Sequence, residues 1–409
     1  MTLKRWVKKK TKIIRKRYET ITIHSVFSDI KFSIPRYIYN DGKHRASTRP
    51  FSEFTGINSG YFSLKLQRII TDFSINNNFR DVSKKLKEHY NLDIGTTSIK
   101  SILYNKVGVY TKDFYEHLIS KGKITEALVL EVQVDGVFIP IALYNKTKSI
   151  GEDNRVKLIY REVKHVGVIK PGKIKGLNFA VITPKEKIKE FSKDILKILK
   201  LSGFSKNTEV FGLADGAKWI ENLLKDDVFK ENSFYYLIDF FHLAEYIHDA
   251  VKSLPDSKKY LIDKFKTMAK EGRTEDILKE IKDLKLIEES IEVIRNIDKT
   301  IKGVRVTVKE KVNLVKALYD YINNRYGNFD YPFFRKNNMP NGTGRIESAN
   351  KILVKKRMDI PFGWTEKNAN TMLELIMIKN NGFFEQFWQY VRSKKSYNKV
   401  DYLESEKAA

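Results

Sequence analysis

Apolar and polar residues alternate in several segments of the first half of the chain, and this pattern predicts β-strands. The alternation is clearest at 128–135, an apolar segment follows Gly136 at 137–143, and a third strand is expected at 156–168. A period of two indicates a strand because successive side chains point to opposite faces of a sheet. Gly136 follows an aspartate, and Asp-Gly is a common hairpin dipeptide. We therefore expect the first two segments to form a long antiparallel pair, with a third strand beside it.

Two shorter apolar runs, 210–215 and 235–239, each end on an aspartate. Short runs without alternation are typical of central strands that are buried on both faces. Helical spacing is found before the first run, at 179–199, and between the two runs, at 218–224. Three antiparallel strands, a helix, a strand, a helix and a strand predict an α/β sheet in the manner of ribonuclease H.

Apolar residues recur at three- and four-residue spacing through 243–326, which predicts helices. The stretch 286–301 follows the same spacing, so the segment is expected to be an all-α insertion. A last helix is expected to start near Arg345. Beyond Arg392 the chain is polar and lysine-rich, which predicts a frayed tail.

The N-terminal part combines extended and helical patterns. Extended pieces are expected at 21–27 and 34–39, and three helices between 62 and 106. The third helix begins with Thr-Thr-Ser after a short turn, which resembles a helix-turn-helix whose second helix enters the major groove. Thr97 and Lys100 are then expected DNA contacts. Simple packing of three helices is the alternative.

These patterns divide the chain into six parts. They are a basic N-terminal region (1–60), a helical DNA-binding domain (61–124), the first part of a ribonuclease H-like core (125–242), an all-α insertion (243–335), the last core helices (336–395) and a tail (396–409).

The charge balance points to a polyanionic partner. The 409 residues include 76 Lys and Arg against 50 Asp and Glu, a formal charge of +26. Such a field favours nucleic acid, with double-stranded DNA as the expected partner. No stretch of about 18 uncharged apolar residues is found, and the basic start lacks an apolar signal segment, so we expect a cytoplasmic, nucleoid-associated protein outside the membrane. The absence of cysteine excludes disulfides, thiolate zinc sites and cysteine nucleophiles.

Asp135 and Asp215 each close a predicted strand of the same sheet. Functional groups gather at strand ends in open α/β sheets, and an aspartate there is costly to bury without a cationic partner. Two such groups and a glutamate from a neighbouring helix would form an all-oxygen cage for Mg²⁺ or Mn²⁺, with two ions expected. Taken singly, each aspartate is also explained by an Asp-Gly turn. Spacing does not select the glutamate, and Glu131, Glu221 and Glu245 are all eligible.

Four segments carry a family resemblance. They are Val134–Ile139, Leu213–Ile220, Leu237–Glu245 and Gly342–Lys351, the last followed by Lys356–Met358 and Gly363-Trp364. In this order they resemble the acidic motifs and the Asp/Cys-x-x-His signature of Mutator-like bacterial insertion-sequence transposases, and within that group the transposases of mycoplasma integrative conjugative elements. The resemblance covers about 130–365. Ala214 departs from the usual Gly-Asp-Gly of the second motif, and the first 120 residues match only loosely.

The resemblance implies a DDE transposase with a ribonuclease H-like core that an all-α domain interrupts before the last helix. It implies that Asp135, Asp215 and Glu347 are the catalytic metal ligands. Asp239 and His242 would lie close to the active centre in a supporting role, although Asp239 is also a rival to Asp215 as second ligand.

Four basic residues follow Glu347 on its predicted helix and are expected phosphate contacts, because that helix must face DNA if Glu347 is catalytic. They are Lys351, Lys355, Lys356 and Arg357. Trp219 and Trp364 are expected to be core residues rather than stacking platforms for bases.

The expected function is DNA cleavage with water followed by joining with the freed 3′-hydroxyl. Two DNA ends must be held together, so a homo-oligomer is expected. One alternative is a nuclease with the same core that does not join strands. Another is a decayed element protein kept as a DNA-binding regulator, although all three carboxylates are present. An RNA-binding scaffold is supported only by charge and aromatic content.

Overall fold

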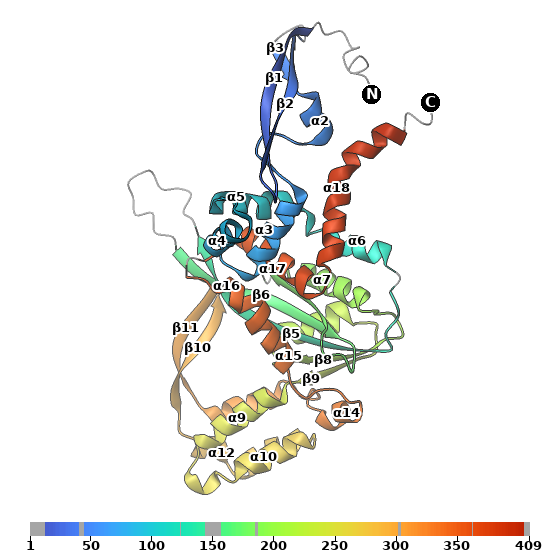
Figure 1. Cartoon of the computed structure of the whole chain (residues 1–409). Coiled ribbons are helices and arrows are strands. Elements are labelled where there is room, and N and C mark those ends of the chain that lie inside the picture. The colour runs from blue at the N-terminus through green and yellow to red at the C-terminus, as the bar shows by residue number, and fades with distance from the viewer. Residues whose placement is uncertain are drawn as a thin grey trace. The chain divides into compact units, whose positions relative to one another are not determined.

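The computed structural model describes residues 13–40, 45–122, 124–143, 157–184, 187–301, 304–361 and 363–404. The chain forms two compact units, drawn together in Figure 1. One unit comprises Met1–Thr111 with Phe383–Ala409, and the other comprises Lys112–Gly382. The acidic motifs all belong to the second unit.

The first unit contains a four-stranded sheet and a group of helices. The sheet has the order β3-β2-β1-β4, with β1 and β2 forming an antiparallel hairpin. The strands are β1 (Ile13–His24), β2 (Asp29–Asn40), β3 (Arg45–Thr48) and β4 (Tyr61–Phe62), and helix α2 (Pro50–Thr55) lies between β3 and β4 in the sequence. Ile21 and Ile34 are each 2% exposed and pack in its core. The two predicted extended pieces are thus present and are longer than the alternation indicated.

The helices of the first unit begin where polar residues cap them. They are α3 (Leu64–Asn76), α4 (Phe79–Tyr90), α5 (Thr96–Ser101), which continues as η1 (Ile102–Val107) and η2 (Gly108–Tyr110), and α18 (Phe384–Glu404). Ser63 and Asn78 accept backbone N–H bonds at the starts of α3 and α4. Asn91, with φ 53°, ends α4 in the left-handed region that asparagine tolerates. The three helices are therefore where the periodicity predicted them.

Helix α18 differs in length and in packing from the predicted end of the chain, which was a core helix to 395 and a frayed tail after it. It runs from Phe384 to Glu404 without the predicted break at 395/396, and it belongs to the same compact unit as the N-terminal elements. Phe387 and Val391 are fully buried on it. Its apolar side chains thus give the helix a packed face, which the lysine-rich composition obscured.

The second unit is built on a mixed five-stranded sheet with the order β7-β6-β5-β8-β9. The strands are β5 (Val129–Leu143), β6 (Lys157–Ile169), β7 (Leu177–Ile182), β8 (Glu209–Ala214) and β9 (Phe234–Ile238). Strand β6 is antiparallel to both β5 and β7, whereas β8 and β9 are parallel to β5.

The predicted turn at Gly136 was wrong. Strand β5 passes straight through this residue, and β6 pairs with it from Glu131 to Leu143. The two segments are one strand because β6 offers a partner residue at every position on both sides of the glycine. A side chain at Gly136 would also meet the carboxylate of Glu162 on β6, so the glycine serves close packing between strands.

The predicted helix over 179–199 was also wrong at its start. Residues 177–182 form β7, and helix α7 (Ile188–Leu201) begins only after the loop that contains Pro184. A proline lacks the N–H that a helix interior needs, so strand and helix are separate elements.

Helices cover both faces of the sheet. They are α6 (Phe114–Lys121), α7, α8 (Lys218–Asn222) with η4 (Leu223–Val228), α15 (Gly344–Ala349) with η6 (Asn350–Lys355) and α16 (Lys356–Met358), and α17 (Glu366–Asn380). His165 and Lys164 are neighbours on β6 and so point to opposite faces. His165 meets Asn350 of η6, whereas Lys164 lies 3.8 Å from the centre of the Trp219 ring of α8. The helix that carries Glu347 and helix α8 therefore lie on opposite faces.

The insertion after β9 is not all-α. Its helical elements are α9 (Phe240–Lys252), η5 (Asp256–Lys258), α10 (Leu261–Lys270), α11 (Thr274–Asp283), α12 (Leu286–Glu289), α13 (Leu314–Asn323) and α14 (Tyr331–Lys336). Between α12 and α13, however, β10 (Val293–Ile301) and β11 (Val304–Val312) form an antiparallel hairpin, visible in Figure 1. Val304, Val306 and Val308 alternate with polar residues, and β-branched residues favour strands. The isoleucines in 286–301 are spaced as in a helix, but residues 293–301 of this stretch form a strand.

Within the described part of the chain, no helix is both long enough and apolar enough to cross a membrane.

Candidate metal centre

Three aspartates lie at the same level of the central sheet. Gln133 pairs with Leu213 across β5 and β8, and two residues further along each strand are Asp135 and Asp215. Ala214 pairs with Ile238 across β8 and β9, and the next residues are Asp215 and Asp239. The parallel register therefore places the three residues side by side, with Asp135 inside β5 rather than at its predicted end, and Asp215 and Asp239 just past the ends of β8 and β9.

Helix α15 is fastened along β5 by three residues that share one face of that strand. Arg345 Nη1 donates to Glu131 Oε2 at 2.7 Å, and the Ile346 amide donates to Gln133 Oε1 at 3.0 Å. Asn350 Nδ2 donates to Asp135 Oδ2 at 2.7 Å. Because these contacts begin before Glu347 and end after it, they return its helix to β5 across some two hundred residues of sequence.

The surroundings of Asp135 oppose its ionisation. Burial is the main cause, and the negative charges of Asp215 and Glu347 add to it, so that the pKa of Asp135 rises to about 6. Hydrogen bonds from the Gly136 amide and from Asn350 act in the other direction. The carboxylates thus lie close enough to repel one another, and a cation among them would relieve the repulsion.

Asn350 connects Asp135 to a buried histidine. Its Oδ1 lies 2.7 Å from His165 Nδ1. Asn350 Nδ2 donates to Asp135, so its Oδ1 faces the histidine, and Asn178 Oδ1 lies 3.1 Å from the other ring nitrogen, Nε2. His165 is fully buried, and burial lowers its pKa to about 4. A neutral histidine therefore orients the amide that holds Asp135.

Asp215 occupies a tight turn after β8. Its Oδ1 accepts from the Ala217 amide at 2.8 Å, and Gly216 has φ +87°, a region that favours glycine. Helix α13 and the residues after it hold this turn: Tyr321 Oη donates to the Asp215 carbonyl at 2.8 Å, and Arg325 Nε donates to the Gly216 carbonyl at 2.7 Å. The insertion thus fixes the backbone of the proposed second ligand.

Asp239 is 1% exposed and has four hydrogen-bond donors around it. Oδ1 accepts from the amides of Phe241 at 2.5 Å and His242 at 3.3 Å, which caps helix α9. Oδ2 accepts from the Thr343 amide at 2.6 Å and from the Thr343 hydroxyl, which also lies 2.9 Å from Glu347 Oε1. Asp239 therefore ties the segment before Glu347 to the start of α9.

In the described part of the chain, the group of three possible ligand atoms within 4.8 Å of one another comes from Asp239, His242 and Glu347. Asp135 and Asp215 do not belong to this group. The side chain of His242 is 38% exposed, with Nδ1 3.8 Å from Glu245 Oε2. Asp239 accepts from three backbone amides, which leaves it few open lone pairs for a metal ion.

The glutamates that spacing left open have other partners. Glu131 is 2% exposed and pairs with Arg345. Burial disfavours the charge of Glu221, but hydrogen bonds from Lys225 and Asn328 outweigh it and lower its pKa to about 2. The side chain of Glu245 is 76% exposed. Of the four, Glu347 is the one whose charge acts on Asp135.

The basic residues after Glu347 separate into two groups. Lys351, Lys355 and Lys356 are exposed. Arg357 is 7% exposed with its guanidinium carbon 4.8 Å from the centre of the Trp364 ring, so its expected phosphate contact is wrong. Residue 357 points inward because the helix turns its apolar face, with Met358, to the core.

The other expected surface and core residues are as follows. Thr97 and Lys100 are exposed on α5. Trp364 is 5% exposed, which confirms it as a core residue. Trp219 is half-buried, with its ring against Lys164, which itself is 1% exposed and pairs with Glu162 at 2.9 Å.

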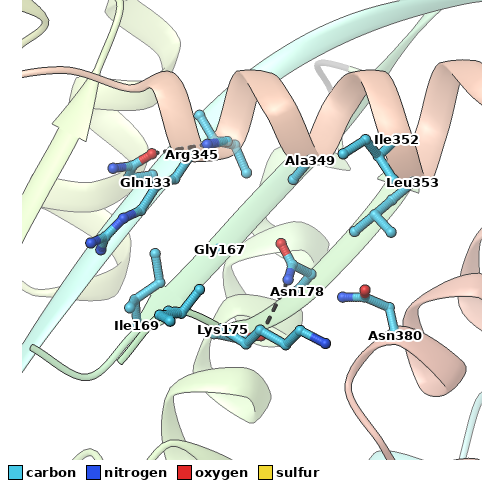
Figure 2. Close-up of a pocket in the computed structure, with 13 residues that line it drawn as sticks. Gln133, Gly167, Ile169, Lys175, Asn178, Arg345, Ala349, Ile352, Leu353 and Asn380 are labelled. Atoms are coloured by element: carbon cyan, nitrogen blue, oxygen red, sulfur yellow. Dashed lines mark hydrogen bonds between the residues drawn. The ribbon is translucent and has the colours of Figure 1, made fainter. Parts of the chain in front are cut away.

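A pocket of about 250 Å³ opens beside helix α15–η6 (Figure 2). Figure 2 shows Gln133 at β5 together with Ala349, Ile352 and Leu353 along the helix. Lys175 and Arg345 supply positive charge to its wall. Since Gln133 is two residues from Asp135, the pocket adjoins the carboxylates on the same face of the sheet.

Sequence reasoning missed the residues that hold the site together. They are Asn350, Tyr321, Arg325, Thr343 and Gln133. Asn350 alone left a signal, since it follows Glu347 by three positions and so lies on the same side of its helix. The other contacts join segments far apart in the chain.

No model of a protein family matches the chain, and no curated protein matches it. Among solved structures it is similar to the Drosophila P element transposase strand transfer complex, with 10% identity and a TM-score of 0.28 over 84% of this chain and 83% of that chain. It is also similar to the Mos1 strand transfer complex, with 8% identity and a TM-score of 0.12 over 52% of this chain and 78% of that chain. Both TM-scores are low, so these likenesses establish neither fold nor function.

Proposed function

We propose that the protein is a DDE transposase or integrase that cuts and joins DNA with divalent metal ions at Asp135, Asp215 and Glu347. The observation that carries the proposal is electrostatic: the charges of both Asp215 and Glu347 raise the pKa of Asp135. The register of β5 and β8, which aligns the two aspartates, and the hydrogen bonds of the Ile346 amide and of Asn350 to β5 on either side of Glu347 support it. The sheet order β7-β6-β5-β8-β9 supports a ribonuclease H-like core around the site.

The donor set fits Mg²⁺ or Mn²⁺. Three carboxylates supply hard oxygen ligands, and their mutual repulsion at Asp135 is what a bound cation would remove. When bound, two such ions would activate the attacking oxygen and stabilise the leaving 3′-oxygen of a phosphodiester.

The chain's own residues supply the positioning. Asn350 holds one oxygen of Asp135 and the Gly136 amide holds the other. The Ala217 amide donates to Oδ1 of Asp215, so Oδ2 is the oxygen that we propose binds a metal ion. We assign Asp239 and His242 a supporting role, because Asp239 is fully occupied as a helix cap and as an anchor for Thr343.

DNA is the proposed substrate on grounds of charge. The net charge of +26 favours a polyanion, and Lys351, Lys355 and Lys356 are exposed on the helix that carries Glu347. Thr97 and Lys100 on α5 are proposed contacts of a helix-turn-helix with the element ends. Assembly on two DNA ends would require a homo-oligomer.

The test is a strand-transfer assay with pre-cut DNA ends in Mg²⁺ or Mn²⁺. We expect joined product from the intact protein and none from Asp135→Asn, Asp215→Asn or Glu347→Gln. Glu245→Gln is the matched control, since it removes an exposed carboxylate outside the cage and should retain activity. Retained joining in the Glu347→Gln protein would refute the assignment of the third ligand.

Two other functions are distinguished by this assay and by an in vivo comparison. Hydrolysis of DNA without joined product would identify a nuclease with the same site. If the Asp135→Ala protein behaves like the intact protein in vivo, the chain acts as a DNA-binding regulator.

A further inference from the structure

Two consecutive phenylalanines begin helix α9, and their side chains have different surroundings. The ring of Phe240 packs edge-to-face on the fully buried Tyr331, with 5.4 Å between the ring centres. Phe241 is instead 67% exposed. A single exposed apolar residue is common on protein surfaces, so the position of Phe241 decides whether it has a role.

Phe241 lies against the segment that leads to Glu347. A Cβ atom at Gly342 would come within 2.8 Å of the Phe241 ring, so the glycine leaves room for the ring. The residue after Gly342 is Thr343, whose hydroxyl lies 2.9 Å from Glu347 Oε1. The exposed ring therefore packs on the neighbour of a residue that contacts a proposed metal ligand.

Hydrogen bonds fix the backbone of Phe241 at this place. Its amide donates to Asp239 Oδ1 at 2.5 Å, and Asp239 Oδ2 accepts from the Thr343 amide at 2.6 Å. The next residue, His242, has a ring nitrogen within 4.8 Å of a carboxylate oxygen of Glu347. Asp239 is 1% exposed, so the anchor is inside the protein while the ring is at the surface. The protein thus presents an aromatic ring in a fixed position close to Glu347.

A cut DNA end offers a surface that fits such a ring. The last base of a strand has no neighbour on one face, and every base has a π-face on which an aromatic side chain can stack. In strand transfer, the attacking 3′-hydroxyl belongs to this last nucleotide, and one sugar carries both the hydroxyl and the base. A 3′-hydroxyl held at the metal ligands therefore brings its own base to the residues around Glu347.

We propose that Phe241 stacks on the terminal base of the DNA strand whose 3′-hydroxyl is joined. The ring would cover the free face of the base and so orient the sugar that carries the hydroxyl. Because every base has such a face, this contact would hold a DNA end without reading its sequence. The inference rests on the proposed function, since it requires the 3′ end at Glu347.

The experiment measures binding of a pre-cut DNA end to the full chain in Mn²⁺ without target DNA. Two ends are compared: a complete end, and an abasic end that lacks only the base of the 3′-terminal nucleotide. We expect the intact protein to bind the abasic end at least about fivefold more weakly, because a stacked base is lost. Phe241→Leu should bind the complete end at least about fivefold more weakly than the intact protein and should not distinguish the two ends.

Three further variants control the comparison. Phe241→Tyr keeps an aromatic ring and should restore the discrimination between the two ends. Tyr260→Leu removes another aromatic ring of the insertion, 57% exposed, and should leave both affinities within about twofold of those of the intact protein. Thermal melting separates a loss of binding from a loss of folding, and Phe241→Gln replaces the leucine variant if that protein is unstable.

The discrimination between the two ends decides the proposal. If Phe241 is only structural, the Phe241→Leu protein still distinguishes the complete end from the abasic end, and this result overturns the proposal. Equal binding of both ends by the intact protein also overturns it, and joined product in the strand-transfer assay would then leave the proposed function standing. If Phe241→Leu abolishes the discrimination but the intact protein forms no joined product, the stacking contact stands and strand transfer is refuted. An intact protein that binds neither end overturns both.

Discussion

Replacing Asn350 with alanine should weaken both folding and metal binding. The residue is 4% exposed and makes two hydrogen bonds of 2.7 Å, one to the Asp135 carboxylate and one to His165 Nδ1. A hydrogen bond to a charged group contributes about 1.5–3 kcal/mol, and an unpaired buried donor costs about 1–3 kcal/mol. Asp135 is half-buried, so water recovers part of the first loss. We expect the free energy of unfolding to fall by about 2–4 kcal/mol.

The same substitution should lower metal affinity without removing a ligand. Groups that orient a metal ligand typically account for about 10–100-fold in affinity. Without the amide, Asp135 loses a bond that favours its charged form, so its pKa rises further and the proton competes more strongly with the metal. We therefore expect Mn²⁺ affinity at pH 7 to fall by about 10–100-fold.

Urea unfolding and calorimetric Mn²⁺ titration measure the two effects. Ser348→Ala is the matched control, because Ser348 is exposed on the same helix and its loss should change neither quantity. An Asn350→Ala protein whose Mn²⁺ affinity and unfolding free energy equal those of the Ser348→Ala protein would refute the role of Asn350 in holding Asp135.

Three further substitutions test other contacts of the site. Tyr321→Phe removes the donor to the Asp215 carbonyl and should lower the free energy of unfolding by about 0.5–1.5 kcal/mol. It should also reduce strand transfer, and a parallel fall in Mn²⁺ affinity would assign that loss to the metal site. Asp239→Asn replaces one accepting oxygen by an amide donor, so it cannot accept from both the α9 amides and Thr343 and should lower the melting temperature. It should reduce Mn²⁺ affinity less than Asp215→Asn does, and the reverse order would make Asp239 the ligand. The pKa of His165 is about 4 in the folded protein and near 6.5 in the unfolded chain. The stability that the neutral histidine contributes is therefore present above pH 6.5 and is lost as the pH falls towards 4. Between pH 7 and pH 5 the intact protein should therefore lose about 2 kcal/mol more stability than His165→Gln, and equal losses by urea unfolding would contradict the neutral histidine.

The strands that end on aspartates could be found in the sequence because their signal is local. An uninterrupted apolar run followed by Asp215 or Asp239 reads as a buried strand without knowledge of its neighbours. The two segments on either side of Gly136 also predict extended chain, but the Asp-Gly pair between them predicts a turn. Only the partner strand, with Glu162 filling the space beside Gly136, shows that the chain continues.

The hairpin in the insertion could not be predicted for a related reason. Isoleucines at 287, 291, 294 and 297 satisfy a helical spacing, yet residues 293–301 pair with 304–312. Short apolar runs fit both periods, and the choice depends on whether a partner strand is available. A hairpin supplies that partner, and the β-branched valines of its second strand stabilise the pairing.

The third carboxylate could not be chosen from sequence spacing, because spacing gives no information on the neighbours of each glutamate. Glu131, Glu221 and Glu347 are equivalent as residue types, and their environments separate them. Arg345 neutralises the first and Lys225 the second, so both carboxylates are already paired. The charge of Glu347 instead raises the pKa of Asp135.

The insertion belongs to the proposed active site rather than being an appendage to it. The distance in sequence between Asp239 and Glu347 is spanned by helices that return to the carboxylates from two sides. Tyr321 reaches the Asp215 carbonyl and Arg325 reaches the Gly216 carbonyl. A shift of α13 would therefore move the backbone of the proposed second ligand.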